Sequence, residues 1–258
     1  MSTVLVICAM EEEARYFRPH LSQPSELPLA GALRRTRGFV GTACVHLVVC
    51  GIGSVHATMA TTAALQHVHP IAILNCGCSG AHVRELRVGD VVVATDVAPL
   101  DVGVIARDGA VRRPGVRRRM QDAPVRRWPA DERLLAHARR VVDRASPGGS
   151  DPPKVAFGVV GSSDTWRQAT ASVERVRAEA STLCEEMEAA AVAQVADAFG
   201  VPFLAVKDIA NNELVRELNQ LEPEHTSDAQ CAGVALGRAA AEVSVRLVRS
   251  LTEAGSDA

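Results

Sequence analysis

Short runs of β-branched and other apolar residues alternate along the chain with longer Ala-rich segments of helical period. The apolar runs predict strands at 3–9, 44–50, 71–76, 90–95, 154–160 and 202–207. The segments of helical period predict helices at 11–20, 54–68, 131–145, 170–180, 185–199 and 228–251. This alternation is typical of an α/β fold, in which helices cover the faces of a central sheet.

The stretch from 107 to 129 interrupts the pattern. Its sequence, RDGAVRRPGVRRRMQDAPVRRWP, combines many Arg residues with Pro and Gly and has no apolar period. We expect an Arg-rich surface loop, and we do not expect nucleic-acid binding because Trp128 is its one ring for stacking on a base. Residues 1–252 are expected to form a single domain, and 253–258 a disordered tail.

Composition and charge indicate a soluble, cytoplasmic protein. The 258 residues are 47% hydrophobic, and the formal charge of −2 gives no attraction to nucleic acid or to an anionic membrane. The N-terminus lacks the basic region of a signal peptide, and no apolar run approaches the roughly 18 residues of a membrane span. The seven Cys residues lack metal-ligand spacing, so no metal and no cofactor is predicted, and Cys76 and Cys78 are expected to pack.

Three acids, Glu11, Glu12 and Glu13, follow the first predicted strand directly. Ligands of open α/β sheets bind beyond the carboxyl ends of strands, so at least one of these acids is placed to face a crevice. Acids in a first helical turn also complement the helix dipole. The spacing leaves both interpretations open.

Two glycine-containing turns follow other strands. In VVCGIGSVHA, His56 stands where a dinucleotide fingerprint needs its third glycine, which disfavours an NAD site. In ILNCGCSGAH, the strand ends in the small residues Gly77, Cys78, Ser79 and Gly80. Small residues leave room for a flat ligand against backbone amides, although close packing between a strand and a helix would also select them.

The segment STLCEEMEAAAVAQVADAFG places a carboxylate on an apolar helical face. Thr182 and Glu185 fit a capping box, and Glu186 falls on another face of the same helix. The neighbours of Glu188 at helical spacing are Ala191, Val192, Val195 and Phe199. Glu188 is therefore expected to point inward, where ligand hydroxyls, a cation or a structural Arg would have to satisfy it.

The segment VPFLAVKDIANNEL ends a buried strand with Asn211 and Asn212. Alternation places Lys207 and Asn211 on one side of the strand and Asp208 on the other, if the strand continues that far. Asn at the end of a strand is also an ordinary turn residue, so a site and a plain turn both remain open.

Taken together, six segments in sequence order resemble the purine nucleoside phosphorylase and nucleosidase superfamily, most closely its methylthioadenosine/S-adenosylhomocysteine nucleosidase branch. They are ICAMEEEARYF, CGIGSVHA, LNCGCSGA, VGDVVVATDVA, GSSDTW and EEMEAAAVAQVADAFGVPFLAVKDIAN. The resemblance implies a three-layer α/β/α sandwich around a mixed, partly barrel-like sheet. It also implies hydrolysis of the N-glycosidic bond of a purine nucleoside, and a homodimer whose second subunit completes the active site.

The resemblance also implies roles for individual residues. Glu13 would bind and activate the attacking water, and Glu188 would accept from the 2′- and 3′-hydroxyls of the ribose. Trp166, in place of the usual Phe, would stack on the purine. The substrate-binding residues would be Met10, Cys78, Ser79, Gly80, Trp166, Met187 and Glu188.

Asn211 departs from the pattern, because the nucleosidase branch carries an Asp here that protonates N7 of adenine. Asn cannot give up a proton, and a positioned general acid is typically worth about 10²–10⁴ in rate. An Asn can donate to N7 or O6 of a 6-oxopurine and offer a carbonyl in return. We therefore expect a preference shifted toward 6-oxopurine nucleosides, with Asn211 as a catalytic-site residue.

Two alternatives to hydrolysis follow from the same positions. Phosphorolysis is disfavoured because Met10–Glu13 and Leu74-Asn75 stand where phosphorylases of the superfamily carry phosphate-binding Arg residues. A catalytically inactive nucleoside-binding module is the other alternative, with Asn211 marking lost acid function. Beyond Asn211, Glu213 or Arg216 could reach the base or the 5′ group, or simply begin a solvated helix.

Overall fold

The computed structural model describes residues 2–109, 111–117, 119–143, 153–215 and 235–253. The strands are β1 (Thr3–Cys8), β2 (Ser22–Ala30), β3 (Leu33–Val40), β4 (Ala43–Val49), β5 (Ala72–Ala81), β6 (Val91–Pro99), β7 (Val104–Ile105), β8 (Val111–Arg112), β9 (Trp128–Pro129), β10 (Val155–Ser162), β11 (Thr182–Glu186) and β12 (Phe203–Asn212). The helices are α1 (Glu11–Phe17), the 3-10 turn η1 (Arg18–His20), α2 (Ser54–Leu65), α3 (Glu132–Asp143), α4 (Thr170–Ala180), α5 (Ala189–Phe199) and α6 (Arg238–Glu253).

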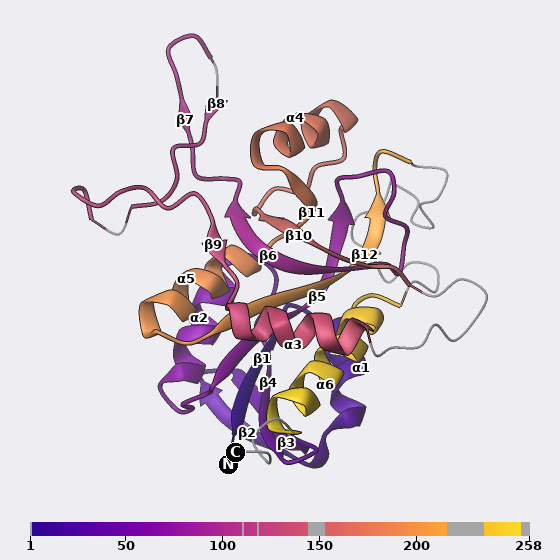
Figure 1. Cartoon of the computed structure of the whole chain (residues 1–258). Coiled ribbons are helices and arrows are strands. Elements are labelled where there is room, and N and C mark those ends of the chain that lie inside the picture. The colour runs from indigo at the N-terminus through magenta and orange to yellow at the C-terminus, as the bar shows by residue number, and fades with distance from the viewer. Residues whose placement is uncertain (1, 110, 118, 144–152, 216–234, 254–258) are drawn as a thin grey trace.

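A mixed 10-stranded sheet forms the centre of the molecule (Figure 1). Its order is β11-β10-β6-β12-β5-β1-β4-β3-β2, with β9 beside β6. Because β11 also pairs with β5, one end of the sheet closes on itself like a barrel. The neighbours β4, β1, β5 and β12 run parallel and bring their carboxyl ends to one edge.

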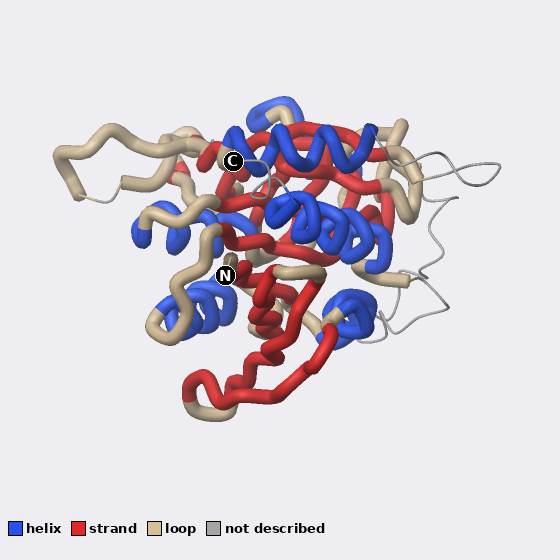
Figure 2. The backbone as a smooth tube through the Cα atoms, turned by 60° about the horizontal axis from the view of Figure 1, so that its bottom comes forward, coloured by secondary structure: helices blue, strands red, loops and turns tan. Residues whose placement is uncertain are grey.

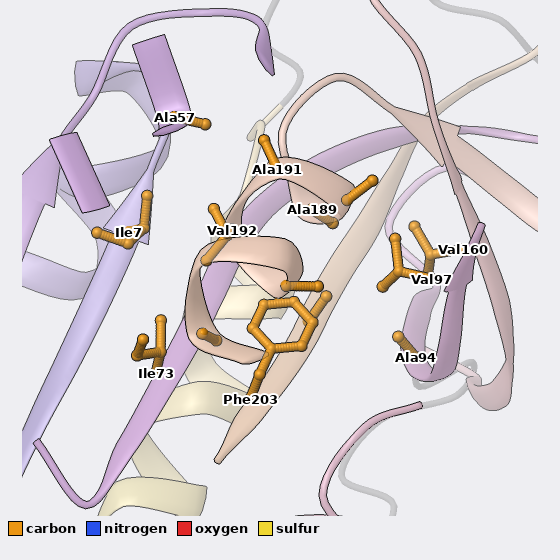
Figure 3. Packing of buried hydrophobic residues seen from close by; sticks show 14 of the residues in the cluster. Ile7, Ala57, Ile73, Ala94, Val97, Val160, Ala189, Ala191, Val192 and Phe203 are labelled. Atoms are coloured by element: carbon orange, nitrogen blue, oxygen red, sulfur yellow. The ribbon is translucent and has the colours of Figure 1, made fainter. Parts of the chain in front are cut away.

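Helices cover both faces of the sheet, as Figure 2 shows. Small residues such as Ala57 on α2 and Ala191 on α5 let these two helices pack closely over one face, where Val192 contributes to the core (Figure 3). On the other face α1, α3 and α6 bury Phe17, Leu135 and Leu247 among other apolar residues. The predicted three-layer α/β/α sandwich with a mixed sheet is confirmed.

The predicted helix over 185–199 is wrong at its start, because α5 begins at Ala189. Thr182 and Glu185 lie in β11 and form no capping box. Cys184 and Glu185 instead pair with the end of β5. Pairing with β5 gives the backbone of β11 hydrogen-bond partners, and these outweigh the local preference for a helix cap.

Strands β2 and β3 were not predicted. Most of β2 is exposed, so it lacks the apolar alternation of a buried strand, and it is held by antiparallel pairing with β3. The predicted strands at 71–76 and 90–95 are longer than expected and run to Ala81 and Pro99. The first part of the helix predicted over 228–251 lies outside the described residues, and its described part begins at Arg238.

The Arg-rich stretch forms an arm that projects from the body and carries the small hairpin β7-β8 (Figure 1). Its end differs from the expectation. Trp128 is buried and pairs with Val97 of β6 as part of β9, so its ring belongs to the core. Residues 254–258 of the expected tail lie outside the described residues.

Candidate active site

A cavity of about 290 Å³ lies at the carboxyl edge of β1, β5 and β12, beside β11. Ligand sites of α/β proteins occupy this edge because strand ends deliver side chains from several segments to one place. The residues proposed from the sequence come together here from separate parts of the chain. All nine line the cavity: Met10, Glu13, Cys78, Ser79, Gly80, Trp166, Met187, Glu188 and Asn211.

Of the three acids after β1, Glu13 is the one that enters the cavity. Glu13 is buried, whereas Glu11 is exposed and pairs with Arg18 at 2.8 Å. As the third residue of α1, Glu13 reaches back to the backbone N–H groups of Ala9 and Met10, at 2.7 and 3.1 Å. The strand-to-helix turn itself therefore fixes this carboxylate.

Strand β5 holds Glu13 from the other side. The N–H of Cys78 donates to Glu13 Oε1 at 2.9 Å. A Cβ atom at Gly77 would lie 2.3 Å from the same oxygen, so a larger residue would displace the carboxylate from this position. Three of the roughly four lone-pair sites of the carboxylate are thus used, which leaves one for a water or a ligand.

Glu188 is buried, as expected, but it precedes α5 instead of lying within it. The N–H of Gly53 donates to Glu188 Oε1 at 2.7 Å. The Gly-Ile-Gly turn therefore serves to present a backbone amide, and Gly53 adopts φ of 96° to do so. Burial raises the pKa of Glu188 to about 8, and the nearby charge of Glu186 adds to the shift.

Glu186 also lines the cavity, and structural contacts hold it there. Its carboxylate lies 2.8 Å from Lys207 Nζ and accepts the N–H groups of Glu188 and Ala189. Burial acts to lower the pKa of Lys207, but the surrounding carboxylates, led by Glu186, outweigh it and hold the pKa above its usual value. The ion pair fixes the turn from β11 into α5 that carries Glu188.

The two asparagines at the end of β12 have different roles. Asn212 donates to the carbonyl oxygens of Val83 and Leu86 at 2.9 and 2.8 Å and accepts from Leu214 N, so it ties the turn together. Asn211 lines the cavity, and its Nδ2 donates to Glu213 Oε1 at 3.0 Å. Glu213 lines the cavity too, whereas Arg216 lies outside the described residues.

A register shift in β12 places Asn211. Opposite β5, Ile209 pairs with Ser79 and Asn211 pairs with Gly80, so Ala210 is an extra residue. Ala210 and Asn211 both line the cavity, and the predicted alternation is therefore wrong beyond Ile209. Lys207 and Asp208 do diverge as expected, since Asp208 accepts from backbone N–H groups at the start of α6.

The sequence interpretation missed several cavity residues, among them the ionisable residues His82, Arg167 and Glu185. His82 and Arg167 each lie one residue beyond a segment that carries the resemblance, and this adjacency could have indicated them. Glu185 was assigned to a helix cap. In the structure Arg167 Nη1 donates to Glu185 Oε2 at 2.6 Å, and both side chains are buried.

Within the described part of the chain, no cluster of three or more His, Cys, Asp and Glu side chains could hold a metal ion. The described helices include none that is long and apolar enough to cross a membrane.

The family model described as the phosphorylase superfamily matches residues 3–246. The 5′-methylthioadenosine/S-adenosylhomocysteine nucleosidase of Bacillus subtilis is 37% identical over 215 residues, which are 81% of this chain and 86% of that protein.

Two solved structures from Helicobacter pylori, each 22% identical, share the fold. One is an Asp-to-Asn mutant of the 5′-methylthioadenosine/S-adenosylhomocysteine nucleosidase with 5′-methylthioadenosine in the active site, with a TM-score of 0.76 over 98% of this chain and 99% of that chain. The other is futalosine hydrolase, with a TM-score of 0.74 over 98% and 97%.

Proposed function

The chain belongs to the phosphorylase superfamily, and we propose that it hydrolyses the N-glycosidic bond of a purine nucleoside. The observation that carries this proposal is the meeting of Glu13, Glu188 and Asn211 on one cavity. In this proposal the two carboxylates serve the sugar, and the amide serves the base. A relative that is 37% identical is itself called a nucleosidase.

The sugar is the centre of the reaction, since breaking the bond gives it oxocarbenium character. The Glu13 carboxylate stabilises that charge and uses its remaining lone-pair site to orient a water molecule toward the anomeric carbon. As the bond to the base breaks, the water adds to carbon, and Glu13 takes its proton. Gly77 keeps the carboxylate in this position by leaving room for it.

Glu188 binds the ribose. Its carboxylate, fixed through Gly53 N–H, accepts hydrogen bonds from the 2′- and 3′-hydroxyls. Met187 and Met10 line the cavity beside it and exclude water from the sugar. Trp166 stacks on the base.

The base leaves with developing negative charge, and Asn211 stabilises it without transferring a proton. The contact with Glu213 orients the Asn211 amide, so that its other N–H and its carbonyl oxygen serve the base. A 6-oxopurine suits this amide. We therefore propose a preference shifted toward 6-oxopurine nucleosides, and the structural likeness to futalosine hydrolase is compatible with it.

Water is the proposed nucleophile. Among the residues that the structure describes, Arg167 is the one Lys or Arg that lines the cavity, and its guanidinium is paired with Glu185. A phosphate nucleophile would require cations around it. Release of base should therefore proceed at the same rate with and without added phosphate, and dependence on phosphate would overturn the hydrolytic assignment.

A substrate panel tests the proposal. Release of base is measured for adenosine, 5′-methylthioadenosine, inosine, guanosine and futalosine, with wild-type protein and with Glu13→Gln. Hydrolysis by the wild type that is strongly slowed in E13Q supports the function. A clear preference for the adenine compounds would contradict the shift toward 6-oxopurines.

A binding module without turnover is the second candidate, favoured by Asn211 itself. An Asp-to-Asn mutant of a structural neighbour holds a nucleoside in its active site. The variant Asn211→Asp separates the two candidates. In this variant a second carboxyl group would lie about 3.0 Å from the Glu213 carboxylate. Two carboxyl groups this close share a proton, which the introduced carboxyl group could donate to the base as a general acid. If wild type only binds, N211D should gain turnover of adenine nucleosides.

A homodimer is proposed as well. Ile52, Val55, Met59 and Phe199 are exposed apolar residues on and beside α2 and α5, and Ile52 also lines the cavity. Exposed apolar residues that lie close together support an interface at this surface. Sedimentation velocity should show a dimer that Val55→Asp dissociates, and a monomeric wild type would contradict the proposal.

A further inference from the structure

Glu185 has no part in the reaction described above, yet it lines the same cavity. Its side chain is 8% exposed. Arg167 donates to it twice, from Nη1 to Oε2 at 2.6 Å and from the backbone N–H to Oε1 at 3.3 Å. The carboxylate is therefore held in one place in the wall of the cavity.

The guanidinium of Arg167 is held by other protein groups, so it is Glu185 and not Arg167 that is available to a ligand. Its Nη1 also donates to Ser163 Oγ at 3.0 Å, and its Nη2 lies 3.7 Å from Asp101. The guanidinium is thus shared between two acids. The Glu185 carboxylate can therefore accept further hydrogen bonds in addition to those from Arg167.

His82 gives a second, independent sign of a polar ligand. It lines the cavity and is 1% exposed, and its Nδ1 is bonded to Thr182 Oγ1 at 2.7 Å. Its Nε2 lies 3.6 Å from Glu185 Oε2 and has no hydrogen-bond partner among the described residues. Buried polar groups in native proteins are nearly always satisfied, and a ligand is one way to satisfy this one.

Gly80 separates Glu185 from Asn211. In the sheet, Gly80 pairs with Glu185 of β11 on one side and with Asn211 of β12 on the other. Register partners direct their side chains to the same face, and neighbouring strands lie roughly 4.8 Å apart. Gly80 leaves room for the Asn211 amide, because a Cβ atom there would lie 3.1 Å from Asn211 Oδ1. The acid and the amide therefore line the same cavity from the two strands on either side of Gly80.

The chemistry of the purine edges decides which base fits. With N7 toward Asn211, the 6-substituent also faces Asn211, and the edge around N1 and C2 faces Glu185. In adenine that edge carries the acceptor N1 and a C–H, so it offers the carboxylate no donor and sets two acceptors against each other. In hypoxanthine it carries N1–H, and in guanine it adds a 2-amino group.

We propose that Glu185 determines base specificity by accepting the N1–H of a 6-oxopurine, with the guanine 2-amino group as a further donor. Arg167 and His82 position the carboxylate. The inference rests on the proposed function, because that function sets the base with N7 toward Asn211.

Methylated ligands test the inference on the wild-type protein. Binding of hypoxanthine, 1-methylhypoxanthine and adenine is measured by calorimetry, and kcat/KM is measured for inosine, 1-methylinosine and adenosine. Loss of the hydrogen bond to a charged acceptor should weaken the 1-methyl compounds and adenine by roughly 10- to 100-fold. Equal binding of hypoxanthine and 1-methylhypoxanthine would overturn the inference.

Variants separate hydrogen bonding from steric exclusion of the methyl group. Glu185→Ala removes the acceptor and makes room, so it should bring inosine and 1-methylinosine to similar kcat/KM values. Glu174→Gln, on the exposed face of α4, is the matched control and should change nothing. Unchanged discrimination in E185A would contradict the proposed role.

The outcomes distinguish the inference from the function on which it rests. Selective binding of hypoxanthine without release of base from any nucleoside would contradict hydrolysis and support the role of Glu185. Hydrolysis of both base classes with no effect of N1 methylation would support the function and overturn the inference.

Discussion

Lys207 Nζ and Glu186 Oε2 lie 2.8 Å apart, and the two side chains are 1% and 2% exposed. A buried ion pair of this kind is strongly destabilising to break, because removing one partner leaves the other charge buried and alone. The pair also supports the turn that carries Glu188. Its loss should therefore affect both folding and binding.

We expect Lys207→Met to lower the free energy of unfolding by about 3–5 kcal/mol, measured by guanidinium denaturation. The exposed Lys154 gives a matched control, and Lys154→Met should have little effect. The double variant K207M/E186L, which removes both charges, should recover much of the loss. A K207M protein as stable as K154M would show that the pair contributes little.

Gly77→Ala should reduce kcat by roughly 100-fold, because a methyl group 2.3 Å from Glu13 Oε1 must displace the carboxylate. The effect should not add to that of E13Q, since both changes act through the same group. Turnover of inosine and circular dichroism spectra are the measurements. A G77A/E13Q double variant far slower than E13Q alone would place the damage elsewhere.

Nucleoside affinity should rise as pH rises through about 8, because burial raises the pKa of Glu188 to that value and only the carboxylate accepts from both ribose hydroxyls. KM or Kd for inosine is measured between pH 6 and pH 9, a range that includes the pKa of Glu188 at about 8. In Glu188→Gln the dependence should disappear. A pH dependence retained in E188Q would assign it to another group.

The raised pKa of Glu188 also affects folding stability, which should fall as the pH rises while nucleoside affinity increases. The pKa of Glu188 in the folded protein, about 8, lies above its ordinary value of 4.5. The contribution of this group to stability is therefore complete below about pH 4.5 and is lost as the pH rises through about 8. From pH 6 to pH 9, the midpoint temperature of thermal unfolding should decrease less for E188Q than for wild type.

Trp166→Ala should weaken binding of hypoxanthine by about 1–3 kcal/mol, the usual contribution of stacking between a base and an aromatic ring. The chain has two Trp residues, and Trp128 is buried in the core. In a Trp128→Phe background, intrinsic fluorescence thus reports on Trp166 alone. Emission that does not change when ligand saturates the protein would contradict stacking.

The six segments that resemble the superfamily were sufficient to predict the sandwich and nine of the residues that line the cavity. Glu13, Gly80 and Asn211 each sit in a short segment that ends a strongly apolar strand, and strand ends of one direction meet at one edge. That information is local and therefore visible in the chain. The roles of these residues remain predictions.

Long-range pairing accounts for the errors. Glu185 has the spacing of a helix cap, and only the pairing of β11 with Gly80 moves it into the cavity wall. Asn211 owes its place to the extra residue Ala210, which no local pattern marks. The partners of the exposed strand β2 are likewise set by tertiary pairing, which overrides local propensity.

The arm that carries β7 and β8 leaves the sheet after β6 and rejoins it at β9, where Val97 is paired with Trp128. Its two ends are therefore neighbours, and a change of length within it leaves the order of the strands intact. The exposed turn at Gly109 is accordingly suited to carry a fluorescent label or an affinity peptide. In homologous proteins, loops of this type also vary in length and sequence while the core stays the same.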